Sequence, residues 1–214
     1  MRKYFAEGIG TFALMFCGAG AVVIDEITKG SVSHVGIAIT FGLIVMSMIY
    51  SIGDISGAHM NPAVTLAFAI NKSFQWKEVM PYLVSQAIGA FAAMYILKFL
   101  FPSSIVLGST LPSGEAMQSF LLEIILSFFL MFVILNVATG SKEQGMFAGL
   151  AIGSVVLLEA MFAGPISGAS MNPIRSLAPA IVAGHSAYLW IYLSAPFIGT
   201  ILAVFFYRII KNKS

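Results

Sequence analysis

The chain has 214 residues, of which 59% are hydrophobic and only 9% are charged. Soluble domains carry about 25% charged residues, so this composition excludes an ordinary soluble fold and predicts an integral membrane protein. The net charge of +2 is small and the basic residues form no stripe, which argues against a nucleic-acid partner.

Six apolar runs have the length of a membrane-spanning helix, about 20 residues for a bilayer core about 30 Å thick. They cover residues 5–24, 34–52, 79–101, 117–139, 145–163 and 186–209. The first run follows Arg2-Lys3 in the manner of a secretory signal. Because it is also part of a repeat, described below, we expect it to remain as a spanning helix. Its single cysteine, Cys17, is interpreted as a small buried hydrophobic residue.

Two short segments between the spans agree in six of seven residues. The first is Ser-Gly-Ala-His-Met-Asn-Pro, residues 56–62, and the second is Ser-Gly-Ala-Ser-Met-Asn-Pro, residues 167–173. Asn followed by Pro is typical of a helix start, since Asn caps free N–H groups and Pro has none to satisfy. Each segment therefore predicts a new helix inside the membrane.

The predicted helices are too short to cross a bilayer. The apolar stretch after the first segment runs from Ala63 to Ile70, and its helix is counted from Asn61; the second element runs from Asn172 to about Val182. About ten residues of helix reach about 15 Å, half of the bilayer core. Irregular backbone at that depth is tolerated only where it lines a polar cavity, so we expect a pore or a binding site there.

The repeat extends over most of the chain. The run from Glu7 matches the run from Glu123 at an offset of 116 residues, and Tyr82 matches Tyr192 at an offset of 110. We expect one domain, 1–214, built from repeat one (about 1–101) and repeat two (about 117–214). Each repeat has three spans, so the second is inverted relative to the first. The predicted fold is an all-α membrane protein with six transmembrane helices and two half-helices that meet at the midplane.

The basic residues predict the orientation, because Lys and Arg collect on the cytoplasmic side. With both termini in the cytoplasm, only Lys29 and Lys98 fall near the outside. The residues on the inside are then Arg2, Lys3, Lys72, Lys77, Lys142, Arg208, Lys211 and Lys213. We expect a multi-pass protein of the cytoplasmic (plasma) membrane with the lipid bilayer as its surroundings.

Two helix N-termini that meet at one point create a positive potential, which opposes cations and protons. The amides of Asn61 and Asn172 can cap their helices with the oxygen and offer N–H donors to a solute. The backbone before them is expected to be extended and to present carbonyl acceptors in a row, at Gly57, Ala58, His59, Gly168, Ala169 and Ser170. Such a lining suits water and other small neutral molecules with hydroxyl groups.

These features resemble the aquaporin (major intrinsic protein) family over essentially the whole chain. The first signature reads Asn61-Pro62-Ala63, and the second reads Asn172-Pro173-Ile174, where the family usually has Ala. Ile174 puts a larger side chain beside the midplane and leaves the pore width there open. The resemblance implies a passive channel, without cofactor or metal, that assembles as a homotetramer with one pore per subunit.

The resemblance also implies a selectivity constriction outside the midplane. By spacing from the two Asn residues it is formed by Phe41, Ala160, Ala169 and Arg175. A lone arginine inside a membrane is costly, so function is its default interpretation, and pairing with a carboxylate is the alternative. We expect Arg175 to donate hydrogen bonds to the solute and to oppose cations.

Water-selective members of the family have His at the position of Ala160. The run from Ala163 to Pro173 looks most like the nodulin-like intrinsic proteins and their microbial relatives. That branch is associated with glycerol and with boric, silicic and arsenous acids. Two alanines predict a wide, apolar constriction, so we expect passage of water plus small polyols or metalloid acids, with a water-selective channel as the alternative.

Three carboxylates lie within the spans. Glu7 and Glu123 occupy equivalent places, and the resemblance implies that each accepts hydrogen bonds from N–H groups of the irregular segments; a proton relay is the alternative. Glu159 has no counterpart, and either faces the pore mouth or is protonated and bonded to a loop. His59 is expected to line the cytoplasmic vestibule rather than act as a titrating gate.

Two other classes of protein compete with a channel. A proton-coupled secondary transporter also uses inverted repeats and broken helices. The symmetric acids are better explained as braces, however, and two positive helix ends facing one point oppose proton passage. The sequence has no His-Glu-x-x-His motif and no Ser-His or Cys-His set placed for catalysis, so we expect no enzyme.

Overall fold

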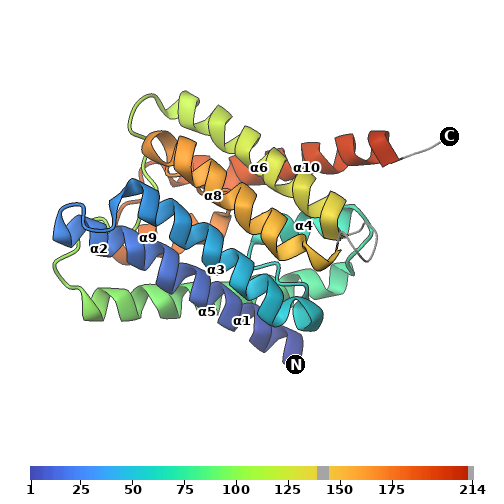
Figure 1. Ribbon diagram of the computed structural model, residues 1–214, viewed down its shortest axis with the longest axis horizontal. Helices are drawn as coiled ribbons and strands as arrows, with labels where there is room; N and C mark the ends of the chain where they lie inside the picture. Colours follow the sequence, from blue (N-terminus) through green and yellow to red (C-terminus); the bar gives the residue numbers. More distant parts are fainter. Residues whose placement is uncertain (139–144, 212–214) are drawn as a thin grey trace.

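The computed structural model describes residues 1–138 and 145–211, and the regular elements in these residues are helices. Six stretches are long and apolar enough to cross a bilayer, which confirms the six predicted spans (Figure 1). The first, Arg2–Thr28, is continuous but consists of α1 (Arg2–Leu14), the π-helical turn η1 (Met15–Ala19) and α2 (Gly20–Thr28). The others are α3 (Ser33–Ser56), α5 (Trp76–Leu100), α6 (Ala116–Ala138), α8 (Ala148–Ser167) and α10 (Leu189–Lys211).

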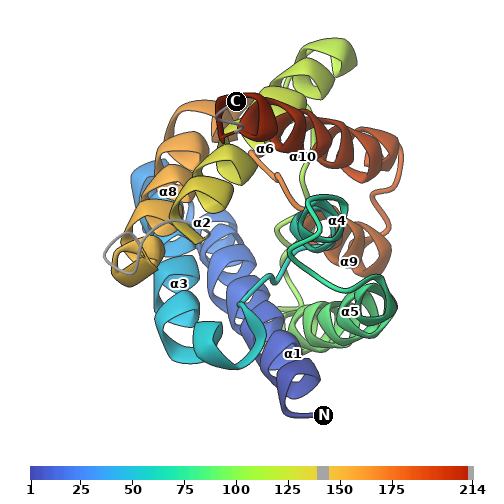
Figure 2. The same ribbon diagram turned by 90° about the vertical axis from the view of Figure 1, so that its right-hand side faces the viewer.

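Two short helices, α4 (Pro62–Ile70) and α9 (Pro173–Ala183), come from opposite ends of the bundle (Figure 1). They have 9 and 11 residues. At 1.5 Å per residue, each reaches about halfway through a bilayer core. Figure 2 looks along the bundle and shows α4 in front of α9. The inverted pair of half-helices predicted from the repeated segments is therefore present.

Glycines set the distances between the long helices. A Cβ on Gly42 of α3 would lie 2.7 Å from the carbonyl oxygen of Gly153 in α8, and a Cβ on Gly153 would lie equally close to the oxygen of Gly42. These two residues occupy equivalent places in the repeats, so the repeats touch backbone to backbone at their shared axis. Small residues at helix crossings are typical of membrane bundles.

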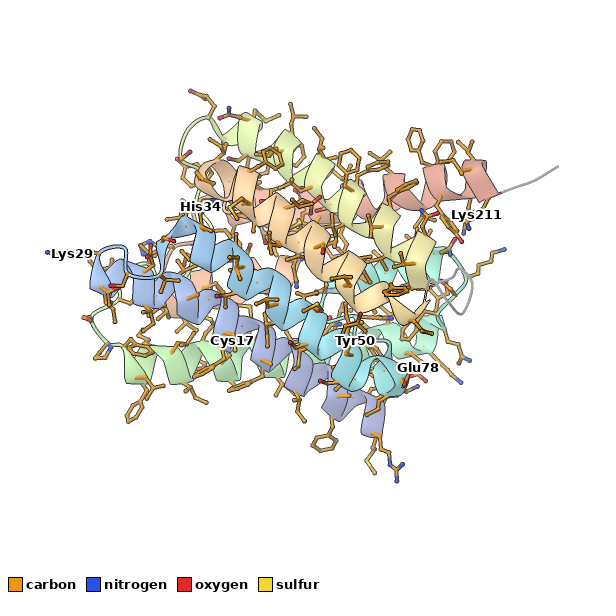
Figure 3. The ribbon with its side chains drawn as sticks, in the orientation of Figure 1. Cys17, Lys29, His34, Tyr50, Glu78 and Lys211 are labelled. Carbon is orange, nitrogen blue, oxygen red and sulfur yellow. The ribbon has the colours of Figure 1, made fainter. Side chains whose placement is uncertain are left out.

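Buried side chains form two clusters. The larger one contains residues of α1, α3, α4, α6, α8 and α10, and the smaller one joins η1 and α2 to α5 and α9. Large apolar side chains such as Phe5, Ile88 and Phe205 remain exposed on the outside, as expected of a surface that contacts lipid. Figure 3 places Lys29 and His34 near one end of the bundle and Glu78 and Lys211 toward the other.

Two of the cationic residues that predict the orientation, Lys142 and Lys213, lie outside the described residues. Cys17 lies in η1 and is only partly buried, although the sequence predicts a buried residue. The buried residues of that turn are Met15, Gly18 and Ala19.

Candidate functional site

Two cavities follow one another through the bundle. The larger one, about 720 Å³, is lined by both Asn61 and Asn172 and extends to Tyr50. The smaller one, about 220 Å³, is lined by His34 and lies toward the other end (Figure 3). Within the described residues, four side chains line both cavities: Phe41, Ala160, Ala169 and Arg175. The four residues that the sequence groups as a constriction therefore lie together where the cavities meet.

Arg175 dominates this junction electrostatically. Its side chain is 5% exposed, and its Nη1 donates a hydrogen bond to the carbonyl oxygen of Gly108 at 2.8 Å. The guanidinium carbon lies 5.0 Å from the centroid of the Phe41 ring, a cation–π distance. In the part of the chain that the structure describes, no carboxylate lies within ion-pair distance of Arg175. The alternative interpretation, in which Arg175 pairs with a buried carboxylate, is therefore not supported by these residues.

The loop that carries Gly108 is tied to α2. The Glu26 carboxylate accepts hydrogen bonds from the Ser104 hydroxyl and from the backbone N–H groups of Ile105, at 2.9 Å, and Val106, at 3.2 Å. Sequence reasoning assigned no role to this loop, because nothing in its composition shows that one of its carbonyls faces an arginine 67 residues away.

The two Asn side chains join the half-helices across the midplane. Asn61 Oδ1 accepts from the N–H of Ala63, and Asn172 Oδ1 accepts from the N–H of Ile174, so each caps its own helix. Each Nδ2 donates at 2.8 Å to a carbonyl of the opposite segment, Asn61 to Met171 and Asn172 to Met60. An amide carries two N–H donors, so each Asn has a second one to offer in the cavity it lines.

The segments before the Asn residues are not extended, and that expectation is wrong. Ala58, Met60, Ala169 and Met171 have φ values of 48°, 49°, 40° and 52°, in the left-handed region that non-glycine residues rarely adopt. Gly57 and Gly168 precede them with φ of 85° and 83°. The predicted acceptor residues line the cavities, with Gly168 on the smaller one and Gly57, Ala58, His59, Ala169 and Ser170 on the larger one.

Two buried carboxylates hold this strained backbone. Glu7 accepts from the backbone N–H groups of His59 and Met60, both at 2.8 Å. Glu123 accepts from those of Ser170 and Met171, also at 2.8 Å. Each carboxylate further accepts from a serine hydroxyl, that of Ser56 in repeat one and that of Ser167 in repeat two. Both glutamates are fully buried, so these bonds replace water entirely.

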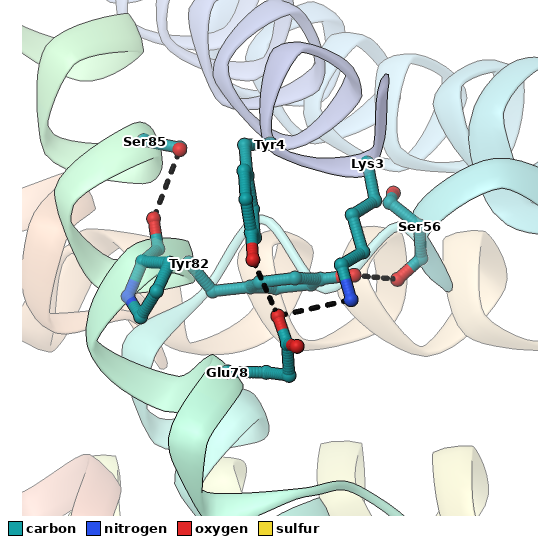
Figure 4. A network of polar contacts seen from close by, with 7 residues as sticks. Lys3, Tyr4, Ser56, Glu78, Tyr82 and Ser85 are labelled. Atoms are coloured by element: carbon teal, nitrogen blue, oxygen red, sulfur yellow. Dashed lines mark hydrogen bonds and ion pairs between the residues drawn. The ribbon is translucent and has the colours of Figure 1, made fainter. Parts of the chain in front are cut away.

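The backbone carbonyls of the same two serines accept hydrogen bonds from two equivalent tyrosines. The Tyr82 hydroxyl donates to the Ser56 carbonyl at 2.8 Å, and the Tyr192 hydroxyl donates to that of Ser167 at 2.6 Å. Figure 4 shows Tyr82 beside Tyr4, whose hydroxyl donates to Glu78. Repeat symmetry had marked the two tyrosines as a matched pair without indicating what they bind.

Ile174 does not narrow the cavity. Its side chain is 4% exposed and belongs to the smaller cluster, with Met15, Met94 and Leu107. It lines neither cavity, so the larger side chain in the second signature fills space behind the half-helix.

Glu159 fits neither of its two sequence interpretations. It is 5% exposed, lines neither cavity, and its carboxyl oxygens have no hydrogen-bond partner among the described residues. His59 lines the larger cavity, with its Nδ1 at 3.1 Å from the Thr65 hydroxyl and its ring 4.8 Å from that of Phe68. Its ring is thus packed within the cavity wall.

The Major intrinsic protein family model matches residues 1–207. The chain belongs to this family. It is 45% identical to "Aquaporin NIP1-1" of Zea mays over 212 residues, which are 99% of this chain and 75% of the relative. It is 43% identical to "Nodulin-26" of Glycine max, covering 99% of this chain and 78% of the relative. Among solved structures it is similar to the aquaglyceroporin from Plasmodium falciparum, with a TM-score of 0.87 and 26% identity over 98% of this chain and 96% of that one.

These likenesses confirm the family, the nodulin-like branch and the fold class that the repeated Asn-Pro segments indicate. They extend over both repeats.

One feature of this major intrinsic protein belongs to repeat two alone. Pro165 lies inside α8 and has no N–H, so it leaves the carbonyl of Met161, four residues earlier, without its helical donor. The His34 ring of α3 is within hydrogen-bond distance of that carbonyl through Nε2. A carbonyl only accepts, so Nε2 carries the proton and donates. His34 thereby replaces the missing helix bond and joins α3 to α8 beside the smaller cavity.

We expect His34→Ala to lower the free energy of unfolding by about 1 kcal/mol, because it leaves a partly buried carbonyl without a donor. Ala at position 165 restores a backbone N–H, so the same His34→Ala change should have little effect in the Pro165→Ala background. The measurement is a double-mutant cycle of unfolding free energies in detergent. Additive effects of the two substitutions would contradict the proposed exchange of donors.

Proposed function

We propose that this chain is a passive transmembrane channel for water and small uncharged solutes, glycerol-like polyols or metalloid acids such as boric and arsenous acid. The observation that carries the proposal is the meeting of two cavities at Phe41, Ala160, Ala169 and Arg175. The likeness to aquaporins and to an aquaglyceroporin supports a channel for water and small solutes.

These four residues act as a selectivity filter in this proposal. Arginine has five N–H donors, of which Gly108 takes one, so others remain for hydroxyl oxygens of a passing solute. The Phe41 ring provides the apolar wall for the carbon side of a polyol. Ala160 and Ala169 contribute only methyl groups, so the opening admits solutes wider than water.

Ions are excluded by the charges that surround this path. The cationic Arg175 is buried at the filter, and the positive ends of α4 and α9 meet at the two Asn residues. A cation must leave its water shell against both fields, whereas a neutral solute exchanges water hydrogen bonds for those of the amides. Proton transfer and catalysis are no part of this function, and no cofactor takes part.

The channel is proposed to lie in the plasma membrane with both termini in the cytoplasm, where Arg2, Lys3, Lys72 and Lys211 then fall. It is proposed to assemble as a homotetramer with one pore in each subunit.

Purified protein in lipid vesicles tests the proposal by light scattering. We expect fast water flux with a low activation energy, entry of glycerol and of undissociated boric or arsenous acid, and no effect of a protonophore. Vesicles that pass water but none of these solutes would reduce the proposal to a water-selective channel. Solute entry that depends on a proton gradient would indicate a transporter instead.

Ala160→His tests the assignment of the filter. A ring at the junction narrows the opening, so glycerol flux should fall at least about tenfold while water flux changes less. Ala148→His is the matched control, because Ala148 is on the same helix but lines only the larger cavity. If Ala160→His lowers water flux alone and leaves glycerol flux intact, the filter has been assigned to the wrong residues.

A further inference from the structure

Corresponding columns of side chains on α6 and on the first span differ in how they line the cavities. On α6 the column is Leu130, Ile134 and Ala138, one residue per helical turn, and all three line the cavity. The equivalent column of repeat one, 116 residues earlier, is Leu14, Gly18 and Val22. Leu14 lines the larger cavity and Val22 lines the smaller one, but Gly18 lines neither.

The Phe41 ring occupies the space that a side chain at position 18 would need. A Cβ built on Gly18 would lie 2.3 Å from Cε1 of Phe41, 2.6 Å from Cδ1 and 2.7 Å from Cζ. Real Cβ atoms essentially never approach other atoms within 3.0 Å. One edge of the ring therefore rests directly on the backbone of Gly18. In repeat two the residues equivalent to Gly18 and Phe41 are Ile134 and Ile152, and both line the larger cavity.

Gly18 belongs to the π-helical turn η1 (Met15–Ala19), whereas the equivalent stretch of α6 is regular α-helix. π-Helical turns are rare and frequently occur at functional sites. The distortion thus occurs in only one of two otherwise matched helices, at the turn that contacts Phe41.

The next residue of η1 supports the other main filter group. The carbonyl oxygen of Gly108 accepts the hydrogen bond from Arg175, and the Gly108 Cα packs so closely against Ala19 that a Cβ on Gly108 would lie 2.9 Å from the Ala19 Cβ. Gly18 therefore contacts the Phe41 ring, and Ala19 contacts Gly108, the hydrogen-bond partner of Arg175. Neither Gly18 nor Ala19 lines a cavity.

We propose that η1, although it lines no cavity itself, sets the width of the filter. Gly18 is a specificity-determining position because it fixes where the Phe41 ring lies, and Ala19 positions the loop whose Gly108 carbonyl binds Arg175. The inference rests on the proposed function, because it assigns a determinant to the same filter. A methyl group at position 18 pushes the Phe41 ring away from α1 and into the junction of the two cavities. The clash is with the far end of a side chain, so the helix itself is preserved.

The test compares water and glycerol permeability of reconstituted Gly18→Ala, Phe41→Ala and the double variant. We expect Gly18→Ala to lower glycerol permeability at least about tenfold, the lower end of what one methyl group does in a tight apolar site, and water permeability less. In the Phe41→Ala background the same methyl group should change neither permeability, because no ring remains to be moved. Gly20→Ala is the matched control, since its Cβ has its nearest neighbour, Leu97 Cδ2, at an ordinary 3.4 Å.

Equal loss of water and glycerol flux in Gly18→Ala, no loss at all, or the same loss without the Phe41 ring would each overturn the inference. If Gly18→Ala does not fold, the double variant must fold, because removal of the ring removes the clash; failure of both would also overturn it. If the unmodified protein passes only water, the wide-filter function fails by itself. The coupling between Gly18 and Phe41 is then measured on water permeability, so the two failures remain distinguishable.

Discussion

Gly89→Ala is expected to prevent normal packing of the first repeat. A Cβ at this position would lie 2.1 Å from the carbonyl oxygen of Gly8 and 3.0 Å from the N atom of Phe12. Both contacts are backbone atoms of α1, so no rotamer change relieves them and α1 must move away from α5. The destabilisation should reach or exceed the top of the ~1–3 kcal/mol range of ordinary overpacking. The clashing carbonyl belongs to Gly8, the residue after Glu7. Movement of α1 therefore also displaces the Glu7 carboxylate, which holds the first irregular segment.

Gly199→Ala provides the same test in repeat two, because its Cβ would lie 2.2 Å from the carbonyl oxygen of Ile124. Gly53→Ala is the control in α3, where the nearest atom is 4.0 Å away and helix propensity favours Ala by up to ~1 kcal/mol. The measurements are the monodisperse fraction in detergent and the midpoint of unfolding. A Gly89→Ala protein that unfolds like the unmodified one would contradict the observed crossing.

The parts of the fold that follow from length and periodicity were predictable. Six apolar runs and two Asn-Pro starts fix the number of spans and half-helices, since a bilayer allows few other solutions. The inversion follows from the odd number of spans per repeat. The ends of the spans were less certain, and the first span, predicted at 5–24, runs over Arg2–Thr28 because amphipathic ends continue beyond the apolar core.

The site was predictable where a residue type is costly or a position is repeated. A buried Arg175 and the pair Glu7 and Glu123 stand out because charges are rare inside a membrane. No costly residue type points to the carbonyl of Gly108 or to the left-handed backbone of Met60 and Met171. They depend on tertiary contacts across the chain, and a local pattern suggested extended backbone instead.

Contacts made by glycine were the hardest to predict. Gly18 differs from a helix-packing glycine such as Gly89 only in what touches it, a filter side chain in one case and a helix backbone in the other. Proline within a span gives a clearer signal, since Pro165 implies that the Met161 carbonyl needs a donor from elsewhere.

Glu123→Gln is expected to lower both stability and water flux strongly, although it changes one atom of a fully buried side chain. The carboxylate accepts from the N–H of Ser170 with one oxygen and from the N–H of Met171 with the other. An amide has one oxygen, so one of these donors faces an NH₂ group and loses its partner. Each unsatisfied buried donor costs about 1–3 kcal/mol, and the loss falls on the strained backbone before Asn172.

Glu159→Gln is the matched control, because Glu159 is also buried in a spanning helix but accepts no hydrogen bond from the described residues. We expect this variant to keep or raise the unfolding midpoint, since it removes a buried carboxyl group that nothing compensates. Unfolding midpoints and vesicle water flux of both variants separate burial from hydrogen bonding as the source of the effect. If the two substitutions behave alike, the hydrogen bonds of Glu123 do not hold the second half-helix in place, and convergence of the two Asn residues must depend on packing and on their own hydrogen bonds to Met171 and Met60.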